Sequence, residues 1–245
     1  MQRKMMGLLA ALVAFAAFAL VPAISSAHGL LDTENVQTTT VGLGKRIVGY
    51  NDVGTSTKFI ASGLTVECSE TTLTGTVHAN PHTDDGAVLG TIEHAYFRGS
   101  ESETKCKSSL GAATITVPAL TQAVGGTSHW CLRTIPTTNN FVVDPRNCTE
   151  PSGGEFTFLL HAGGVTCGYK RTASLTGDFT TPGEHKAATW TLDENQEMTK
   201  HVGGILCPAV GKLAEFKFEM YTDTTSSTPG TWRDATNTAD PIWVT

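Results

Sequence analysis

One short segment gathers most of the side chains that could bind a metal ion. Residues 78–86 hold two imidazoles and two carboxylates within nine positions. The potential ligands are His78, His82, Asp84 and Asp85. Pro81 forbids a helix, so the two histidines cannot share a helical face as they do in metalloproteases. In a loop the four groups could converge on zinc or calcium; the alternative is a polar hairpin loop that bonds its own backbone.

The N-terminal segment predicts export. Arg3 and Lys4 precede an apolar run over residues 7–24, and small residues follow at 25–27. Basic, apolar and small-residue segments in this order are typical of a secretory signal peptide, here residues 1–27. An uncleaved membrane anchor is the alternative, which Pro22 and the small residues disfavour. The mature chain, residues 28–245, is expected to be soluble and to begin at His28.

A mature chain that begins with histidine offers an α-amine and an imidazole from one residue. With a second histidine, these groups could hold copper in a T-shaped site. Ala27-His28-Gly29 resembles the start of secreted lytic polysaccharide monooxygenases. Residues 30–33 do not continue that opening, and no motif identifies the second histidine. An ordinary chain terminus is therefore the favoured interpretation of His28.

Other polar groups carry weaker signals. The acidic stretch 193–197 could bind calcium, but it lacks EF-hand spacing and is typical of a solvated turn. A glycosidase needs two carboxylates, and Glu67, Glu70, Glu93 and Glu155 lie on or near predicted strands. No G-x-S-x-G motif is present, so the sequence does not support an α/β-hydrolase.

Aromatic side chains could form a stacking platform for sugars. The residues concerned are Trp130, Trp190, Trp232, Trp243, Tyr96 and Tyr169. Aromatic residues make up only 7% of the chain, so packing in the core and at strand edges accounts for them more simply.

The charge balance limits the partners. The whole chain has a formal charge of −6, and loss of Arg3 and Lys4 with the signal peptide leaves 15 basic and 23 acidic residues, or −8. Without a run of lysine or arginine, such a chain is a poor candidate for binding nucleic acid or an anionic membrane.

All six cysteines lie in the mature chain, an even number that predicts disulfides after export. They are Cys68, Cys106, Cys131, Cys148, Cys167 and Cys207. A zinc site would need close pairs such as C-x-x-C, and the sequence has none.

Short segments alternate apolar and polar residues with a period of two, which is typical of strands with one buried face. They include Leu64–Cys68, Thr91–Phe97, Ala113–Val117, Glu155–Leu160 and Ala214–Met220. Glycine- and proline-containing turns separate them. The pattern predicts an all-β, antiparallel β-sandwich or barrel.

An internal similarity suggests how the cysteines pair. Gly63–Cys68 leads to Leu73-Thr74-Gly75, and Gly163–Cys167 leads to Leu175-Thr176-Gly177. The next matching cysteine follows after 38 and 40 residues, respectively. We infer two related units, residues 28–150 and 151–245, with disulfides Cys68–Cys106 and Cys167–Cys207. Cys131–Cys148 is then left to close a local loop.

The signal peptide, the G-x-T-V-x-C segment followed by L-T-G, and the repeated cysteine-led strands together resemble uncharacterised secreted β-rich proteins of actinobacteria. The resemblance covers most of the mature chain. It implies a β-rich fold and export, and carries no activity.

The sequence therefore predicts a secreted, non-catalytic β-protein with an extracellular binding or structural role. A carbohydrate or another cell-surface ligand is the expected kind of partner. Nucleic acid, integral membrane association after signal cleavage and a required cofactor are not expected. The alternative is a secreted enzyme acting on polysaccharide, either copper-dependent through His28 or hydrolytic through a carboxylate pair.

Overall fold

The structure is a computed structural model, and it describes about two thirds of the chain. The described residues are 31–32, 41–51, 54–80, 87–100, 103–120, 129–135, 138, 140–148, 153–180, 187–194, 196–222 and 242–244. Within these residues every regular element is a strand, and the strands pair antiparallel throughout. The predicted all-β fold is therefore confirmed.

Eighteen strands are present in the described residues. In chain order they are β1 (Leu31–Asp32), β2 (Arg46–Asn51), β3 (Thr57–Ala61), β4 (Leu64–Cys68), β5 (Glu70–Ala79), β6 (Leu89–Arg98), β7 (Cys106–Ser108), β8 (Gly111–Thr116), β9 (Trp130–Ile135), β10 (Asn140–Asp144), β11 (Phe156–Ala162), β12 (Val165–Arg171), β13 (Leu175–Thr180), β14 (Thr189–Leu192), β15 (Gln196–Val202), β16 (Val210–Ala214), β17 (Lys217–Thr222) and β18 (Trp243–Val244).

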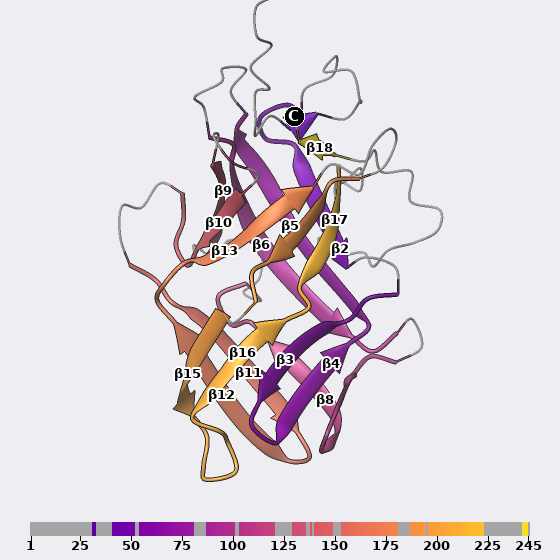
Figure 1. The fold of residues 1–245 in the computed structure, drawn as a ribbon, viewed down its shortest axis with the longest axis vertical. Helices are drawn as coiled ribbons and strands as arrows, with labels where there is room; N and C mark the ends of the chain where they lie inside the picture. Colours follow the sequence, from indigo (N-terminus) through magenta and orange to yellow (C-terminus); the bar gives the residue numbers. More distant parts are fainter. Residues whose placement is uncertain are drawn as a thin grey trace, which may run out of the picture.

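Sixteen of these strands form two closed barrels of eight strands each, one above the other in Figure 1. The upper barrel contains β2, β5, β6, β9, β10, β13, β14 and β17. The lower barrel contains β3, β4, β7, β8, β11, β12, β15 and β16. Around each barrel, neighbouring strands follow one another in chain order, so both barrels have an up-and-down arrangement.

The chain moves between the barrels after every second strand. It leaves the upper barrel after β2, forms the β3–β4 hairpin in the lower barrel and returns as β5. Each barrel therefore takes strands from both sequence segments, 28–150 and 151–245. Neither segment forms a barrel by itself, and their relation by duplication stays a prediction.

One passage between the barrels lies inside a predicted strand. Residues 214–220 were predicted to form one strand, but β16 ends at Ala214 and β17 begins at Lys217. Glu215, at the break, has a φ of 57°, the only positive value at a non-glycine residue among the described residues. Its carboxylate lies 2.7 Å from Lys58 Nζ, and this hydrogen bond raises the pKa of Lys58. The ion pair joins the break to β3.

One continuous core fills both barrels. Trp130 of the upper barrel contacts Phe156 and Phe158 of the lower barrel, with ring centroids 4.7 and 5.8 Å apart. Phe97 and Phe216 make a second contact near the same level, at 6.5 Å. These aromatic contacts link the two interiors.

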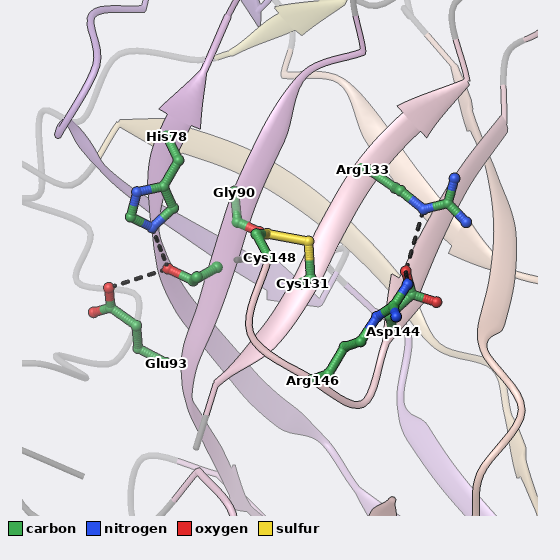
Figure 2. Close-up of a disulfide and its surroundings, with 9 residues drawn as sticks. His78, Gly90, Glu93, Cys131, Arg133, Asp144, Arg146 and Cys148 are labelled. Carbon is green, nitrogen blue, oxygen red and sulfur yellow. Dashed lines mark hydrogen bonds and ion pairs between the residues drawn. A yellow bond between two sulfur atoms is a disulfide. The ribbon is translucent and has the colours of Figure 1, made fainter. Parts of the chain in front are cut away.

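The three disulfides pair as predicted: Cys68–Cys106, Cys131–Cys148 and Cys167–Cys207. Cys68–Cys106 joins neighbouring strands β4 and β7 in the lower barrel. Cys167–Cys207 ties β12 to the turn between β15 and β16. Cys131–Cys148 ties β9 to the segment after β10 (Figure 2).

The far end of the upper barrel is partly closed by the C-terminal segment. β18 pairs with β1, and the neighbouring Ile242 is buried. The Ile242 amide donates to the Met220 carbonyl at 2.9 Å, and its carbonyl accepts from the Ala188 amide at 2.7 Å. Within the described ranges, the structure contains no helix that is long and apolar enough to span a membrane.

Candidate functional site: an apolar cavity in the upper barrel

The upper barrel contains a cavity of about 70 Å³. Side chains from all eight of its strands contribute to the wall, and Phe158, Leu213 and Phe216 close it toward the lower barrel. No ionisable side chain occurs among the described residues that line it. The wall is therefore suited to an apolar molecule and unsuited to a charged one.

Strand alternation aims the lining residues inward. On β6, Ile92 lies on one side of a bulge and Ala95 and Phe97 lie on the other, and all three face the cavity. The bulge shifts the register between Thr74 and Gly75 of β5. A Cβ at Gly75 would lie 2.0 Å from the Thr91 carbonyl oxygen, so glycine is needed for this close approach.

Two tryptophans with buried N–H groups line the cavity. Trp130 of β9 and Trp190 of β14 both line it and are almost fully buried. Neither indole Nε1 has a hydrogen-bond partner among the described residues. Because a buried N–H without an acceptor is costly, these two donors favour a ligand that brings an acceptor with it.

The cavity wall has an adaptable side chain in Met220. Gly49 lies opposite it on β2, and a Cβ there would be 2.9 Å from the methionine sulfur. The missing side chain at Gly49 thus makes room for Met220. An unbranched thioether can change rotamer at little cost, so the cavity can adjust its shape at this position.

The lower barrel contains another buried donor. Tyr169 of β12 is 0% exposed, and its ring packs against Phe59 with centroids 4.8 Å apart. Its hydroxyl has no partner among the described residues, and burial raises the pKa of this phenol. Unlike the two indoles, it does not line the cavity.

We expect Tyr169→Phe to leave the free energy of unfolding unchanged or to raise it by about 1 kcal/mol, because the substitution removes a desolvated hydroxyl and keeps the ring. Urea unfolding near neutral pH measures this. In the wild type, the folded phenol stays neutral above the pH at which the unfolded phenol ionises, so stability falls as the pH rises past about 10. A clear loss of stability in Tyr169→Phe at neutral pH would contradict this account of the hydroxyl.

A hydrogen-bonded row lies on the outer wall of the upper barrel (Figure 2). Glu93 Oε1 accepts from the hydroxyls of Thr76 at 2.7 Å and Thr91 at 3.4 Å. His78 Nε2 lies 3.0 Å from Thr91 Oγ1. His78 donates in this contact when its Nε2 carries the proton, and otherwise accepts from the Thr91 hydroxyl. Thr91 itself is only 3% exposed.

The predicted metal ligands are only partly described. His78 is engaged with Thr91, whereas His28, His82, Asp84 and Asp85 lie outside the described residues. In the part of the chain that the structure describes, no three histidine, cysteine, aspartate or glutamate side chains form a group that could hold a metal ion. Zinc or calcium at residues 78–86 and copper at His28 stay predictions.

The acidic stretch 193–197 is also only partly described. Asp193 accepts a hydrogen bond from the Thr176 hydroxyl, and Asn195 is outside the described residues.

The carboxylates considered for glycoside hydrolysis each have a different partner. Glu67 accepts from Ser56 and lies 3.9 Å from Lys58 Nζ. Glu70 pairs with Arg98, and Glu155 lies 3.2 Å from Lys170 Nζ. None of these residues, nor Glu93, lines the cavity.

Three of the aromatic residues considered as a sugar platform are interior. Trp130, Trp190 and Tyr169 are buried, which confirms core packing for them. Tyr96 is half-buried, and burial raises its pKa. The structure does not describe the side chains of Trp232 and Trp243.

Sequence reasoning missed a buried carboxylate at the end of β10. Asp144 accepts from Arg133 Nε at 3.2 Å and from the Ser174 hydroxyl, and Arg146 Nη2 lies 3.7 Å away (Figure 2). The two arginines neutralise the charge of Asp144, and Arg133 and Ser174 donate hydrogen bonds to it. The carboxylate therefore links β9, β10 and the segment before β13. No local motif marks this residue.

No protein family, curated protein or solved structure matches this chain. The resemblance to secreted actinobacterial proteins accordingly stays a prediction, and the function has to be argued from the site itself.

Proposed function

We propose that the chain is a secreted, non-catalytic binding protein whose upper barrel holds a small apolar molecule with one hydrogen-bond acceptor. The observation that carries the proposal is the apolar cavity lined by Trp130 and Trp190, whose indole N–H groups have no partner among the described residues. An eight-stranded barrel is just wide enough to hold one small ligand.

The extracellular part of the proposal is supported by covalent and sequence features. All six cysteines form disulfides, and disulfides persist in oxidising compartments. Residues 1–27 have the order of segments expected of a secretory signal peptide.

The cavity volume limits the size of the ligand. A dry cavity of about 150 Å³ accepts benzene, and sites for drug-sized ligands occupy roughly 300–1,000 Å³. The cavity here is about 70 Å³. The ligand is therefore smaller than benzene unless Met220 changes rotamer, and its acceptor is a carbonyl, ether or hydroxyl oxygen rather than a carboxylate.

Binding can be tested with two probes, xenon and butanone. Xenon is purely apolar, whereas butanone adds one carbonyl acceptor. We expect both to raise the unfolding temperature of the oxidised protein, and butanone also to change the fluorescence of Trp130 and Trp190. A ligand that binds only the folded state adds about 2.7 kcal/mol of stability at a concentration of 100 times its Kd.

A matched pair of variants locates the effect. Ala95 lines the cavity, so Ala95→Leu should fill it and abolish the response to both probes. Ala112 lies exposed on β8, and Ala112→Leu adds the same bulk outside the cavity. Absence of a response in the wild type and in Ala112→Leu, or an equal response in Ala95→Leu, would rule out the cavity as a ligand site.

A further inference from the structure

The end of the lower barrel that is remote from the upper barrel carries most of the exposed apolar side chains. Four hairpin turns form this end, and we call residues 59–66, 107–114, 159–168 and 198–214 the lower rim. Six large apolar side chains are exposed in the described part of the chain, and five of them lie in the lower rim. These five are Leu110, Val202, Ile205, Leu206 and Val210.

The longest of these turns projects two branched side chains into solvent. Ile205 is 98% exposed and Leu206 is 72% exposed, at the tip of the turn between β15 and β16. This turn is the loop at the bottom of Figure 1. A convex apolar tip has no pocket into which a partner could fit, but it can enter the acyl region of a lipid surface.

The tip is held in this exposed shape by covalent and polar contacts. Cys207 is bonded to Cys167 of β12, and its amide donates to the Gly204 carbonyl at 3.1 Å. Lys200 Nζ donates to the Cys207 carbonyl at 3.0 Å and lies 3.4 Å from the Gly204 carbonyl. Gly203 has a φ of +113°, and a Cβ there would meet the Cys207 sulfur at 2.3 Å. The turn is thus pre-organised, and little ordering is needed when it binds.

Charge is also unevenly distributed at this end. The four segments of the lower rim contain no aspartate or glutamate, although the whole chain has a formal charge of −6. They contain three lysines and two histidines: Lys107, Lys200, Lys212, His161 and His201. Two of these lysines face a carboxylate on the neighbouring strand, because Lys107 is in register with Glu67 and Lys212 with Glu197. Lys200 is in register with Tyr169 and lies nearer the tip, so its charge is the one offered to an anionic surface.

We propose that the lower rim docks on the surface of a membrane that contains anionic phospholipid, with Ile205 and Leu206 inserted among the acyl chains. Lys200 lies behind the apolar tip, at the level of the headgroups. The docking is peripheral, and it does not depend on a ligand in the upper barrel. Insertion of the branched aliphatic side chains contributes the apolar part of the binding free energy. Attraction between Lys200 and the anionic headgroups contributes a second part, which salt weakens.

Sedimentation with vesicles tests the proposal on the secreted, oxidised protein. One set of vesicles contains phosphatidylcholine alone, and the other contains phosphatidylcholine with phosphatidylglycerol. We expect the wild type to sediment with the anionic vesicles, to bind the neutral vesicles less well and to lose part of its binding at high salt. The double variant Ile205→Ser/Leu206→Ser should bind the anionic vesicles at least about tenfold more weakly.

Leu43→Ser is the matched control, because Leu43 is 68% exposed and lies in the turn before β2, outside the rim. It should bind like the wild type, and all variants should unfold at the same temperature since these side chains are exposed. Equal binding by the double variant, or no binding to either vesicle, would overturn the proposal. So would self-association of the wild type in ultracentrifugation that the double variant loses, since the occupant would then be a second copy of the chain.

Discussion

Replacing Cys68 and Cys106 together with alanine is expected to lower the free energy of unfolding by about 4 kcal/mol. The bond closes a loop of 38 residues, and its loss restores conformational freedom to the unfolded chain. Both residues are buried in the lower barrel, so the alanine variant also loses sulfur packing. Urea unfolding of the oxidised proteins, followed by circular dichroism, measures the difference.

The Cys131–Cys148 bond provides the matched comparison. It closes a loop of only 17 residues, so Cys131→Ala/Cys148→Ala is expected to cost about 3 kcal/mol. The order of the two losses matters more than either value, because both variants remove one disulfide. A larger loss for the shorter loop would show that loop entropy does not dominate the contribution of these bonds.

The fold class and the disulfide pairing could be predicted because both depend on local or repeated patterns. Leu64–Cys68 was predicted as a strand from alternation alone, and β4 has these bounds, with alternate residues buried. The cysteine pairs followed from similar spacing after two similar strands. In both cases the signal lies within a few residues or in a comparison of two segments.

The division into two barrels could not be predicted from the same signals. A period-two pattern continues through a break such as Glu215, because the residues on both sides still alternate between core and solvent. Ser69 alone separates β4 of the lower barrel from β5 of the upper barrel. Nothing in the local sequence distinguishes such a passage from the interior of one long strand.

The cavity and the lower rim also depend on long-range arrangement. Trp130 and Trp190 are 60 residues apart in sequence, and their patterns match ordinary core positions. The lower rim combines four segments that each lack acidic residues, whereas the overall charge of −6 suggested a poor match to an anionic membrane. Only the barrel topology brings these four segments to one end.

Trp130→Ala is expected to lower the free energy of unfolding by about 3–5 kcal/mol, because it removes a buried indole and leaves a cavity. Trp130 lies where the two interiors meet, and it contacts Phe156 and Phe158 across the junction. Since the core is continuous and four of the passages between barrels are only one to three residues long, we expect one cooperative unfolding transition rather than two. The same loss of stability should therefore be measured by circular dichroism, which reports on all strands together, and by hydrogen exchange of amides in either barrel.

Trp130→Phe separates the packing of this residue from its N–H group. Phenylalanine keeps an aromatic ring against Phe156 and removes the indole N–H, which has no acceptor among the described residues. Its loss of stability should therefore be well below that of Trp130→Ala, roughly 1–2 kcal/mol. If Trp130→Ala instead lowers hydrogen-exchange protection in the upper barrel and leaves the lower barrel unaffected, the barrels unfold separately. The aromatic contact at their junction would then not couple them.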